Sequence, residues 1–318
     1  MNKRDKVLHL LEDDIEQDYV PAGFFIHFDK TCHHGQAAID KHLEFYQHTG
    51  MDFVKIQYET PFPPRLEIKS PDDWGKMPLY GKDFYEDQLY IVEGLVKKAK
   101  KDALVIMTTY SPFMCAGQTT RHTPDMGQTL ITEHIKENPE KVKQGMEVIT
   151  ESLMLFVKAC IELGVDGFYA STQGGESHRF EDIELFNACV KPYDLALMEE
   201  MNRCCQFNIL HVCDFHDGYD SLAPFVDYPG DVVNCSLTLG DQEISAKEVS
   251  RMFGRLYMGG LDRKGVIATG TEGEIDAAVA EVLQEAPDRF ILGADCTLPA
   301  DIDWDNIRTA ISAAHNPL

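Results

Sequence analysis

Residues 167–213 decide the fold, and they read GFYASTQGGESHRFEDIELFNACVKPYDLALMEEMNRCCQFNILHVC. A short run typical of a strand covers residues 167–172, a helical pattern follows over residues 183–204, and a second strand-like run covers residues 208–213. Two strands joined through a helix lie parallel, because a parallel pair needs a long crossover connection. The stretch therefore predicts one strand–helix–strand unit of an α/β fold.

The same alternation continues along the chain and predicts eight strand–helix units. The predicted strands cover residues 24–28, 53–58, 103–110, 167–172, 208–213, 232–237, 255–261 and 290–296. The predicted helices cover residues 36–49, 86–101, 141–163, 183–204, 221–227, 245–253, 272–285 and 304–315. Eight such units match a (β/α)8 TIM barrel, here expected to be one domain over residues 1–318, with an N-terminal helix over residues 1–20 that covers its bottom. A doubly wound open sheet is the alternative, but no glycine-rich turn follows the first predicted strand.

The charge balance limits the classes of partner. The 318 residues include 29 Lys and Arg against 53 Asp and Glu, which gives a formal net charge of −24. Such a surface repels phosphate backbones, so we expect no nucleic-acid partner. No apolar run reaches the roughly 18 residues that a membrane helix needs, and the charged N-terminus does not resemble a signal peptide. We therefore expect a cytoplasmic protein that does not contact membranes.

Most of the nine cysteines are expected to be small core residues, because they are scattered in a chain without an export signal. Cys213 differs, because it follows His211 by two positions in a predicted strand. Residues i and i+2 of a strand point to one face, and imidazole and thiolate are two of the ligands that zinc prefers. The alternative for this pair is a packed core cysteine beside a hydrogen-bonded histidine.

Cys296 favours the metal interpretation. It closes the eighth predicted strand, so in a barrel it lies at the same end as His211 and Cys213. Three protein ligands and one open position are typical of catalytic zinc, whereas structural zinc sites are closed by four protein ligands. Cys235, at the end of the sixth predicted strand, either completes the site or packs under a helix.

Polar residues follow the carboxyl ends of several predicted strands, where TIM barrels carry their active sites. We assign catalytic roles to His27, Asp29 and Tyr110, and cofactor-binding roles to Gln57, Gln173 and Asp262. For each of these residues alone, the alternative is a solvated loop position. Two long connections, residues 59–83 and 111–139, follow strand ends and are expected to be irregular lids or binding loops over the same face. The alternative for both connections is decoration without a function.

These features resemble the uroporphyrinogen decarboxylase superfamily of (β/α)8 barrels, over nearly the whole chain. The resemblance rests on four segments in the expected order: Gly164-Val165-Asp166-Gly167-Phe168, His211-Val212-Cys213, Gly259-Gly260-Leu261-Asp262 and Gly293-Ala294-Asp295-Cys296-x-x-Pro299. Within the superfamily, His-x-Cys with a distant cysteine resembles the zinc-dependent, corrinoid-linked methyltransferases, such as the methylcobamide:coenzyme M branch. The resemblance implies that His211, Cys213 and Cys296 are zinc ligands.

Two departures from the family pattern bear on the activity. The porphyrin decarboxylases hold substrate carboxylates with an Arg-Gln-Ala-Gly-Arg segment, whereas the corresponding residues 25–30 read FIHFDK, without an arginine. Decarboxylation of uroporphyrinogen is therefore disfavoured. Some methyltransferase relatives carry a metal-binding glutamate near the sixth strand end, where this chain has Asn234-Cys235-Ser236.

The resemblance implies a zinc-dependent methyltransferase that works with a corrinoid, methylcobalamin, carried on a partner protein. A small thiol activated by zinc would attack the methyl group on cobalt(III). In the opposite direction, a methyl-donor substrate would lose its methyl group near His27, Gln57 and Tyr110. Two alternatives are a lyase of the same superfamily acting on a small carboxylate, which basic residues at the rim favour, and a non-catalytic zinc-binding protein, which a site closed by Cys235 favours.

Overall fold

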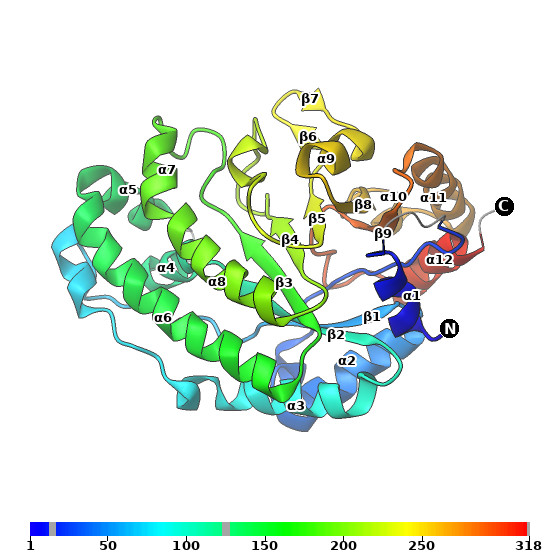
Figure 1. Cartoon of the computed structure of the whole chain (residues 1–318), viewed down its shortest axis with the longest axis horizontal. Helices are drawn as coiled ribbons and strands as arrows, with labels where there is room; N and C mark the ends of the chain where they lie inside the picture. Colours follow the sequence, from blue (N-terminus) through cyan, green and yellow to red (C-terminus); the bar gives the residue numbers. More distant parts are fainter. Residues whose placement is uncertain (13–16, 123–127, 317–318) are drawn as a thin grey trace.

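The centre of the molecule is a curved sheet of seven parallel strands (Figure 1). A computed structural model describes residues 1–12, 17–122 and 128–316. In sheet order the strands are β1 Phe53–Ile56, β2 Leu104–Tyr110, β3 Gly167–Thr172, β4 Ile209–Val212, β5 Val232–Cys235, β8 Leu256–Leu261 and β9 Phe290–Ala294. Each strand pairs in parallel with the next, which confirms the predicted α/β class.

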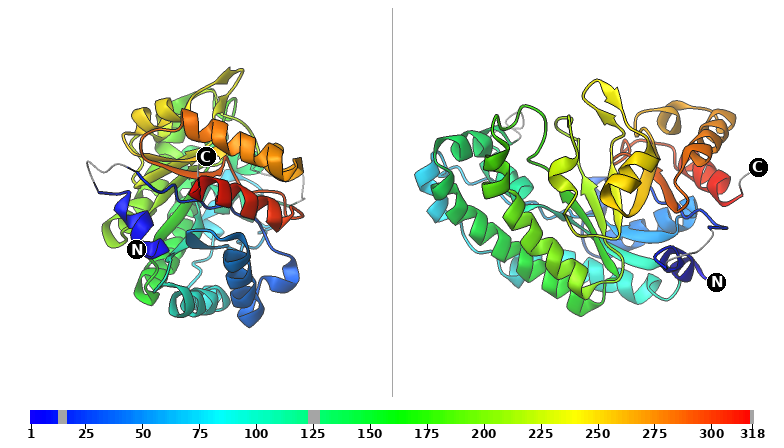
Figure 2. Two further views of the ribbon diagram at one scale, coloured as in Figure 1. Left: turned by 90° about the vertical axis from the view of Figure 1, so that its right-hand side faces the viewer. Right: turned by 45° about the horizontal axis from the view of Figure 1, so that its top comes forward.

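Most of the helices cover the outer, convex face of the sheet (Figure 2). The described helices are α1 Lys3–His9, which lies instead at the amino-terminal ends of the strands, α2 Gly35–Thr49, α3 Glu86–Ala99, α4 Pro112–Thr120, α5 Thr129–Glu137, α6 Pro139–Leu163, α7 Ile183–Cys189, α8 Lys191–Cys204, α9 Ala246–Phe253, α10 Val266–Thr269, α11 Glu272–Glu285 and α12 Trp304–His315. Short 3-10 helices cover Lys30–Cys32, Pro71–Lys76, Lys82–Tyr85 and Ala223–Phe225, and a hairpin is formed by β6 Thr238–Leu239 and β7 Gln242–Glu243. None of these described helices combines the length and the apolar composition needed to cross a bilayer.

The first predicted strand, residues 24–28, is not a strand. The extended chain around Ala22 instead lies against the edge of β9, where the Gly23 amide donates to the Leu292 carbonyl at 3.0 Å. On the other side, the Asp52 amide donates to the Ala22 carbonyl at 3.1 Å. A strand ladder with β1 does not form, because the Ala22 amide donates to the Asp52 carboxylate at 2.8 Å instead of a backbone carbonyl. Within the described residues, the central sheet therefore has seven strands and a bridging segment where the prediction had eight strands.

The N-terminal helix is shorter than predicted. Helix α1 covers Lys3–His9 in place of residues 1–20, and residues 13–16 lie outside the described part of the chain. Val7 of this helix packs into a buried apolar cluster with Phe53, the first residue of β1. The helix therefore covers the inside of the sheet at the amino-terminal ends of the strands.

The inward-facing side chains change from apolar to polar along the strands. In β2, Leu104 and Ile106 belong to the apolar cluster inside the sheet, and Thr108, the next residue of the same face, lines a cavity. In β1 the change comes between Phe53 and Lys55. Because side chains alternate along a strand, each of these sets faces the inside of the curve. The carboxyl ends of the strands therefore surround a polar cavity.

Two further predictions of local structure are wrong. Residues 111–139, expected to be irregular, carry helices α4 and α5, with residues 123–127 outside the described ranges. The predicted helix over residues 183–204 is divided into α7 and α8, because Pro192 lies in the first turn of α8, where its ring prevents a continuous helix. The other long connection, residues 59–83, is irregular apart from two 3-10 turns, as expected.

Asp52→Ala should destabilise the fold strongly. The buried carboxylate accepts from the Ala22 amide at 2.8 Å and from the Tyr19 hydroxyl at 2.6 Å. It also pairs with His315 of α12 at 2.8 Å. Because the substitution leaves these buried donors without a partner, we expect a loss of about 3 kcal/mol in the free energy of unfolding by urea. Asp72→Ala is the control, since that carboxylate is 78% exposed; equal losses would contradict this role of Asp52.

Candidate metal centre

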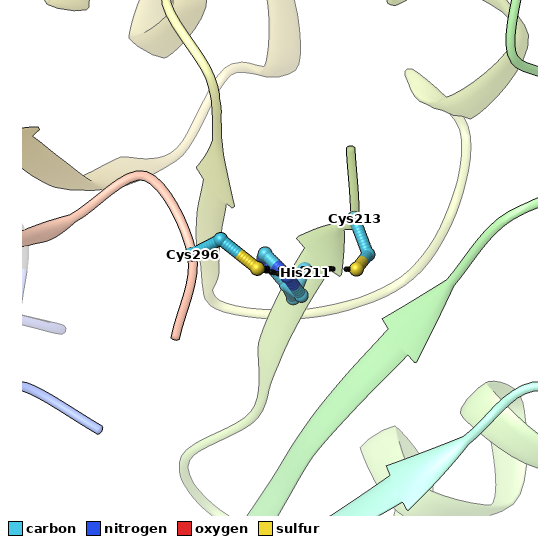
Figure 3. Close-up of side chains that lie close together, drawn as sticks. All are labelled: His211, Cys213 and Cys296. Carbon is cyan, nitrogen blue, oxygen red and sulfur yellow. Dashed lines mark hydrogen bonds between the residues drawn. The ribbon is translucent and has the colours of Figure 1, made fainter. Parts of the chain in front are cut away.

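Three buried ligand side chains meet at the carboxyl ends of two strands. His211 lies in β4, Cys213 follows its last residue, and Cys296 follows β9 (Figure 3). The Cys213 and Cys296 Sγ atoms are 4.0 Å apart, and the Cys296 Sγ lies 3.4 Å from the His211 Nε2. The ligand atoms of all three residues lie within 4.8 Å of one another. The structure therefore brings together the three residues that the sequence predicts as metal ligands.

The geometry of these ligand atoms fits a tetrahedral zinc ion. Ordinary Zn–S and Zn–N lengths place two sulfurs about 3.8 Å apart, and a sulfur and a nitrogen about 3.6 Å apart, at tetrahedral angles. The observed separations of 4.0 Å and 3.4 Å are close to both values. Two thiols and one imidazole are also a donor set that zinc prefers, and they leave one position open. Within the described residues, no other group of His, Cys, Asp and Glu has this arrangement.

The two sulfurs of the site shift the pKa values of each other in opposite directions. A hydrogen bond from the Cys213 thiol lowers the pKa of Cys296, with the nearby His211 and Arg263 as further causes. The same contact raises the pKa of Cys213 well above its usual range. One sulfur is therefore ready to bind a cation as a thiolate, and a metal ion would displace the remaining proton.

The His211 ring stacks on a tyrosine that a hydrogen-bonded chain across the sheet holds in place, while the buried His211 Nδ1 has no hydrogen-bond partner within the described residues. This tyrosine is Tyr169 of β3, and the two ring centroids are 4.9 Å apart with an interplanar angle of 27°. The Tyr169 hydroxyl donates to Asn234 Oδ1 at 2.7 Å, and the Asn234 amide donates to the carbonyls of Met258 and Ala294 at 2.9 Å each. These contacts link four strands behind the imidazole. A rigid ring position is what a metal ligand requires.

Arg263 joins the two chain segments that carry the cysteines. Its guanidinium pairs with Asp214 at 2.8 Å and with Asp295 in a shorter contact. These carboxylates belong to the residues next to Cys213 and Cys296. The two ion pairs of Arg263 therefore help to fix the distance between the Cys213 and Cys296 sulfurs.

Four of the six predicted polar site residues line a cavity of about 250 Å³ that adjoins the ligands. These four are His27, Gln57, Tyr110 and Gln173. Gln173 Nε2 lies 3.4 Å from the Cys213 Sγ, to which it donates, and His27 pairs with Glu59 at 3.0 Å on the cavity rim. The cavity therefore combines the ligand cluster with several uncharged hydrogen-bonding groups.

The other two predicted polar residues do not line this cavity. Asp29 is exposed and accepts from the Thr31 amide at 2.9 Å, so it caps a 3-10 turn. Asp262 lines a neighbouring pocket together with Arg263 and accepts from the Lys264 amide at 2.8 Å. Both side chains are engaged in local turns, which the position of a residue after a strand does not distinguish from a site.

Cys235 does not belong to the ligand cluster. It is buried in the apolar core between the sheet and the helices, because the preceding residue, Asn234, takes the inward position of β5. Burial raises the pKa of the Cys235 thiol, which is typical of a packed core cysteine. The expectation that Cys235 packs under a helix agrees with this position.

Sequence reasoning missed two cationic residues that line the cavity. Lys55 is 5% exposed, and its Nζ donates to Gln57 Oε1 at 3.0 Å. The Arg121 guanidinium has no hydrogen-bond or ion-pair partner within the described residues. The alternation of Lys55 and Gln57 in one predicted strand could have placed the lysine inside the sheet. No local signal distinguishes Arg121 from a surface arginine.

Comparisons with known proteins place these features in a family. The model of the family described as Uroporphyrinogen decarboxylase (URO-D) matches residues 47–317, whereas a comparison with curated proteins finds no match. A methyltransferase from Methanosarcina mazei is similar in structure, with 14% identity, a TM-score of 0.75, and 99% of this chain and 98% of that chain covered.

Two further solved structures are similar with lower scores. A B12-independent methionine synthase from Shewanella sp. W3-18-1, in complex with selenomethionine, has 12% identity and a TM-score of 0.51, with 93% of each chain covered. A putative vitamin-B12-independent methionine synthase from Listeria monocytogenes has 13% identity and a TM-score of 0.50, with 94% of this chain and 96% of that chain covered. At these identities, the likeness shows a shared fold.

Cys213→Ala and Cys296→Ala should each release bound zinc. We expect about one zinc per chain in the parent protein and less than about a tenth of that in either variant, measured by elemental analysis after anaerobic purification. The folded state should persist, because the apolar cores do not include either cysteine. Cys235→Ala is the matched control, a buried cysteine outside the cluster, and should keep its zinc. Unchanged zinc in the first two variants would exclude the site.

Lys55→Met should stabilise the metal-free protein, and the gain should depend on pH. Burial lowers the pKa of Lys55 to about 7, from 10.5 in the unfolded chain. The cost of burying the ammonium is therefore complete below pH 7 and falls as pH rises toward 10.5, because only the unfolded chain stays protonated there. We expect a gain of up to about 4 kcal/mol at pH 6 that shrinks by pH 10, measured by urea unfolding. A gain independent of pH would contradict this assignment.

Proposed function

The chain belongs to the uroporphyrinogen decarboxylase family, and we propose that it is a zinc-dependent methyltransferase of this family that works with a corrinoid protein. One observation carries the proposal, namely the convergence of His211, Cys213 and Cys296 beside a cavity. This S2N set with an open position suits an enzyme that binds a substrate sulfur. The fold shared with the Methanosarcina mazei methyltransferase, at a TM-score of 0.75, supports it.

His211, Cys213 and Cys296 would hold the zinc ion. When bound, the ion supplies a positive charge that lowers the pKa of a thiol substrate, so that the thiolate persists at neutral pH. Gln57 and Tyr110 line the cavity and would orient the substrate, while Gln173 holds the sulfur of Cys213. A methylcobalamin-type corrinoid on the partner protein would supply the methyl group, which the substrate sulfur would accept while the electron pair of the carbon–cobalt bond stays on cobalt.

The mouth of the cavity suits the flat, apolar face of a macrocycle. Phe215 follows the ligand Cys213 by two residues, lines the cavity and is 64% exposed. An exposed aromatic side chain at a cavity rim is typical of a surface that a partner or ligand covers. This feature supports a corrinoid protein as the partner in methyl transfer.

A second candidate function is a lyase that acts on a small carboxylate. It is favoured by the basic side chains that gather at the cavity, since Arg121 and His216 line it in a chain with a net charge of −24. The Arg121 guanidinium, which has no hydrogen-bond or ion-pair partner among residues 1–12, 17–122 and 128–316, suits an anionic group of the substrate. The non-catalytic zinc-binding alternative has no comparable support, because Cys235 packs outside the cluster.

The test of the proposal is demethylation of free methylcobalamin by a thiol under anaerobic conditions. We expect the zinc-loaded protein to accelerate the loss of the methyl-cobalt absorption at least about 100-fold over the thiol alone, because the thiolate is the nucleophile. His211→Ala should abolish the acceleration together with the metal, and Cys235→Ala should retain it.

Two outcomes would reject methyl transfer to a thiol. One is a zinc-loaded protein that does not accelerate the reaction with any thiol of a panel. The other is release of carbon dioxide from a panel of small carboxylates at a rate that Arg121→Gln abolishes, which would favour the lyase.

A further inference from the structure

The buried side chain of Lys55 has no assigned role in the proposed methyl transfer. Lys55 projects from β1 into the same cavity as the metal ligands, and its side chain is 5% exposed. Its Nζ lies 4.4 Å from the centre of the Phe25 ring and 4.6 Å from the centre of the Tyr169 ring. The Tyr169 ring also stacks with the His211 ring, so the ammonium and a predicted ligand contact the same aromatic side chain.

No carboxylate forms an ion pair with Lys55 within the described residues. The nearest hydrogen-bonding partner is the uncharged Gln57, at 3.0 Å. Glu59, two positions further along the chain, pairs with His27 and His33 at the rim instead. A buried ammonium without a hydrogen-bonded anion is costly, and buried charges in proteins are usually paired.

The charge balance of the metal centre identifies that anion. Two cysteine thiolates and a neutral imidazole balance a divalent ion, so the loaded centre is neutral before the substrate binds. A substrate thiolate adds one negative charge to the cavity, and the Lys55 ammonium, which lines the same cavity, balances it. A thioether adds no charge and gains nothing from the lysine. The lysine therefore distinguishes an anionic sulfur from a methylated one.

We propose that Lys55 determines specificity at this centre as the counter-charge of the substrate sulfur, favouring a thiolate over the corresponding methyl thioether. This inference rests on the proposed function, because it assumes that a sulfur substrate binds beside the metal ligands. When the sulfur gains a methyl group it loses its charge, and the attraction to Lys55 disappears. Lys55 would therefore hold the thiol substrate and promote release of the methylated product.

The test compares two small ligands that differ by one methyl group, 2-mercaptoethanol and 2-(methylthio)ethanol. The protein is loaded with cobalt(II) in place of zinc, because a thiolate bound to cobalt absorbs in the near ultraviolet and reports binding without turnover. We expect Lys55→Met to weaken binding of the thiol at least about tenfold and to leave binding of the thioether unchanged. Lys55→Arg keeps the charge and should stay within about threefold of the parent protein.

The control is Lys97→Met, since Lys97 lies on the outer helix α3 and its side chain is 68% exposed. Cobalt content is measured for every variant, so that loss of the metal is distinguished from loss of thiol binding. Equal weakening of both ligands in Lys55→Met would assign Lys55 a structural role and overturn the inference. Unchanged thiol binding in that variant would overturn it while the proposed function stands. A parent protein that binds cobalt but no thiol would overturn both.

Discussion

The alternation of side chains along parallel strands is the constraint on which the site depends. In β4, Ile209 points into the apolar cluster inside the sheet, so His211 must point inward as well, and Cys213 follows on the same face. A shift of one residue would place Val212 inside and both ligands under the helices. The inward-facing apolar residues in the amino-terminal half of each strand therefore determine which side chains face inward at its carboxyl end.

Contacts between distant segments then set the distances within the site. Arg263 holds the residues next to Cys213 and Cys296, and Asn234 reaches the carbonyls of two further strands while it accepts from Tyr169. Because these groups are buried, each missing partner would cost free energy, and the sheet keeps one curvature. A metal site of three ligands from two strands needs that rigidity, since a change of 1 Å between sulfurs would disturb tetrahedral coordination.

The charges inside the sheet oppose those of the chain as a whole. The protein carries a net charge of −24, yet Lys55 and Arg121 line the cavity without a carboxylate partner within the described residues. Among the described residues, Asp52, Asp166, Glu176 and Asp194 are buried, and the other acidic side chains are at least partly exposed. An interior that is cationic and partly apolar favours a small anion such as a thiolate over large polyanions. The cavity therefore favours small anions, whereas the acidic surface repels large polyanions.

The sequence by itself determined the α/β class, the parallel strands and the convergence of His211, Cys213 and Cys296, because these follow from period-two alternation and from the position of each residue at a strand end. Only the tertiary structure decided the rest. It replaced the first predicted strand by an extended segment in which the Ala22 amide donates a hydrogen bond to the Asp52 carboxylate. It also placed Asp29 and Asp262 in turns outside the cavity. These outcomes depend on partners remote in sequence or on local turns, and a residue's position after a strand contains no information about either.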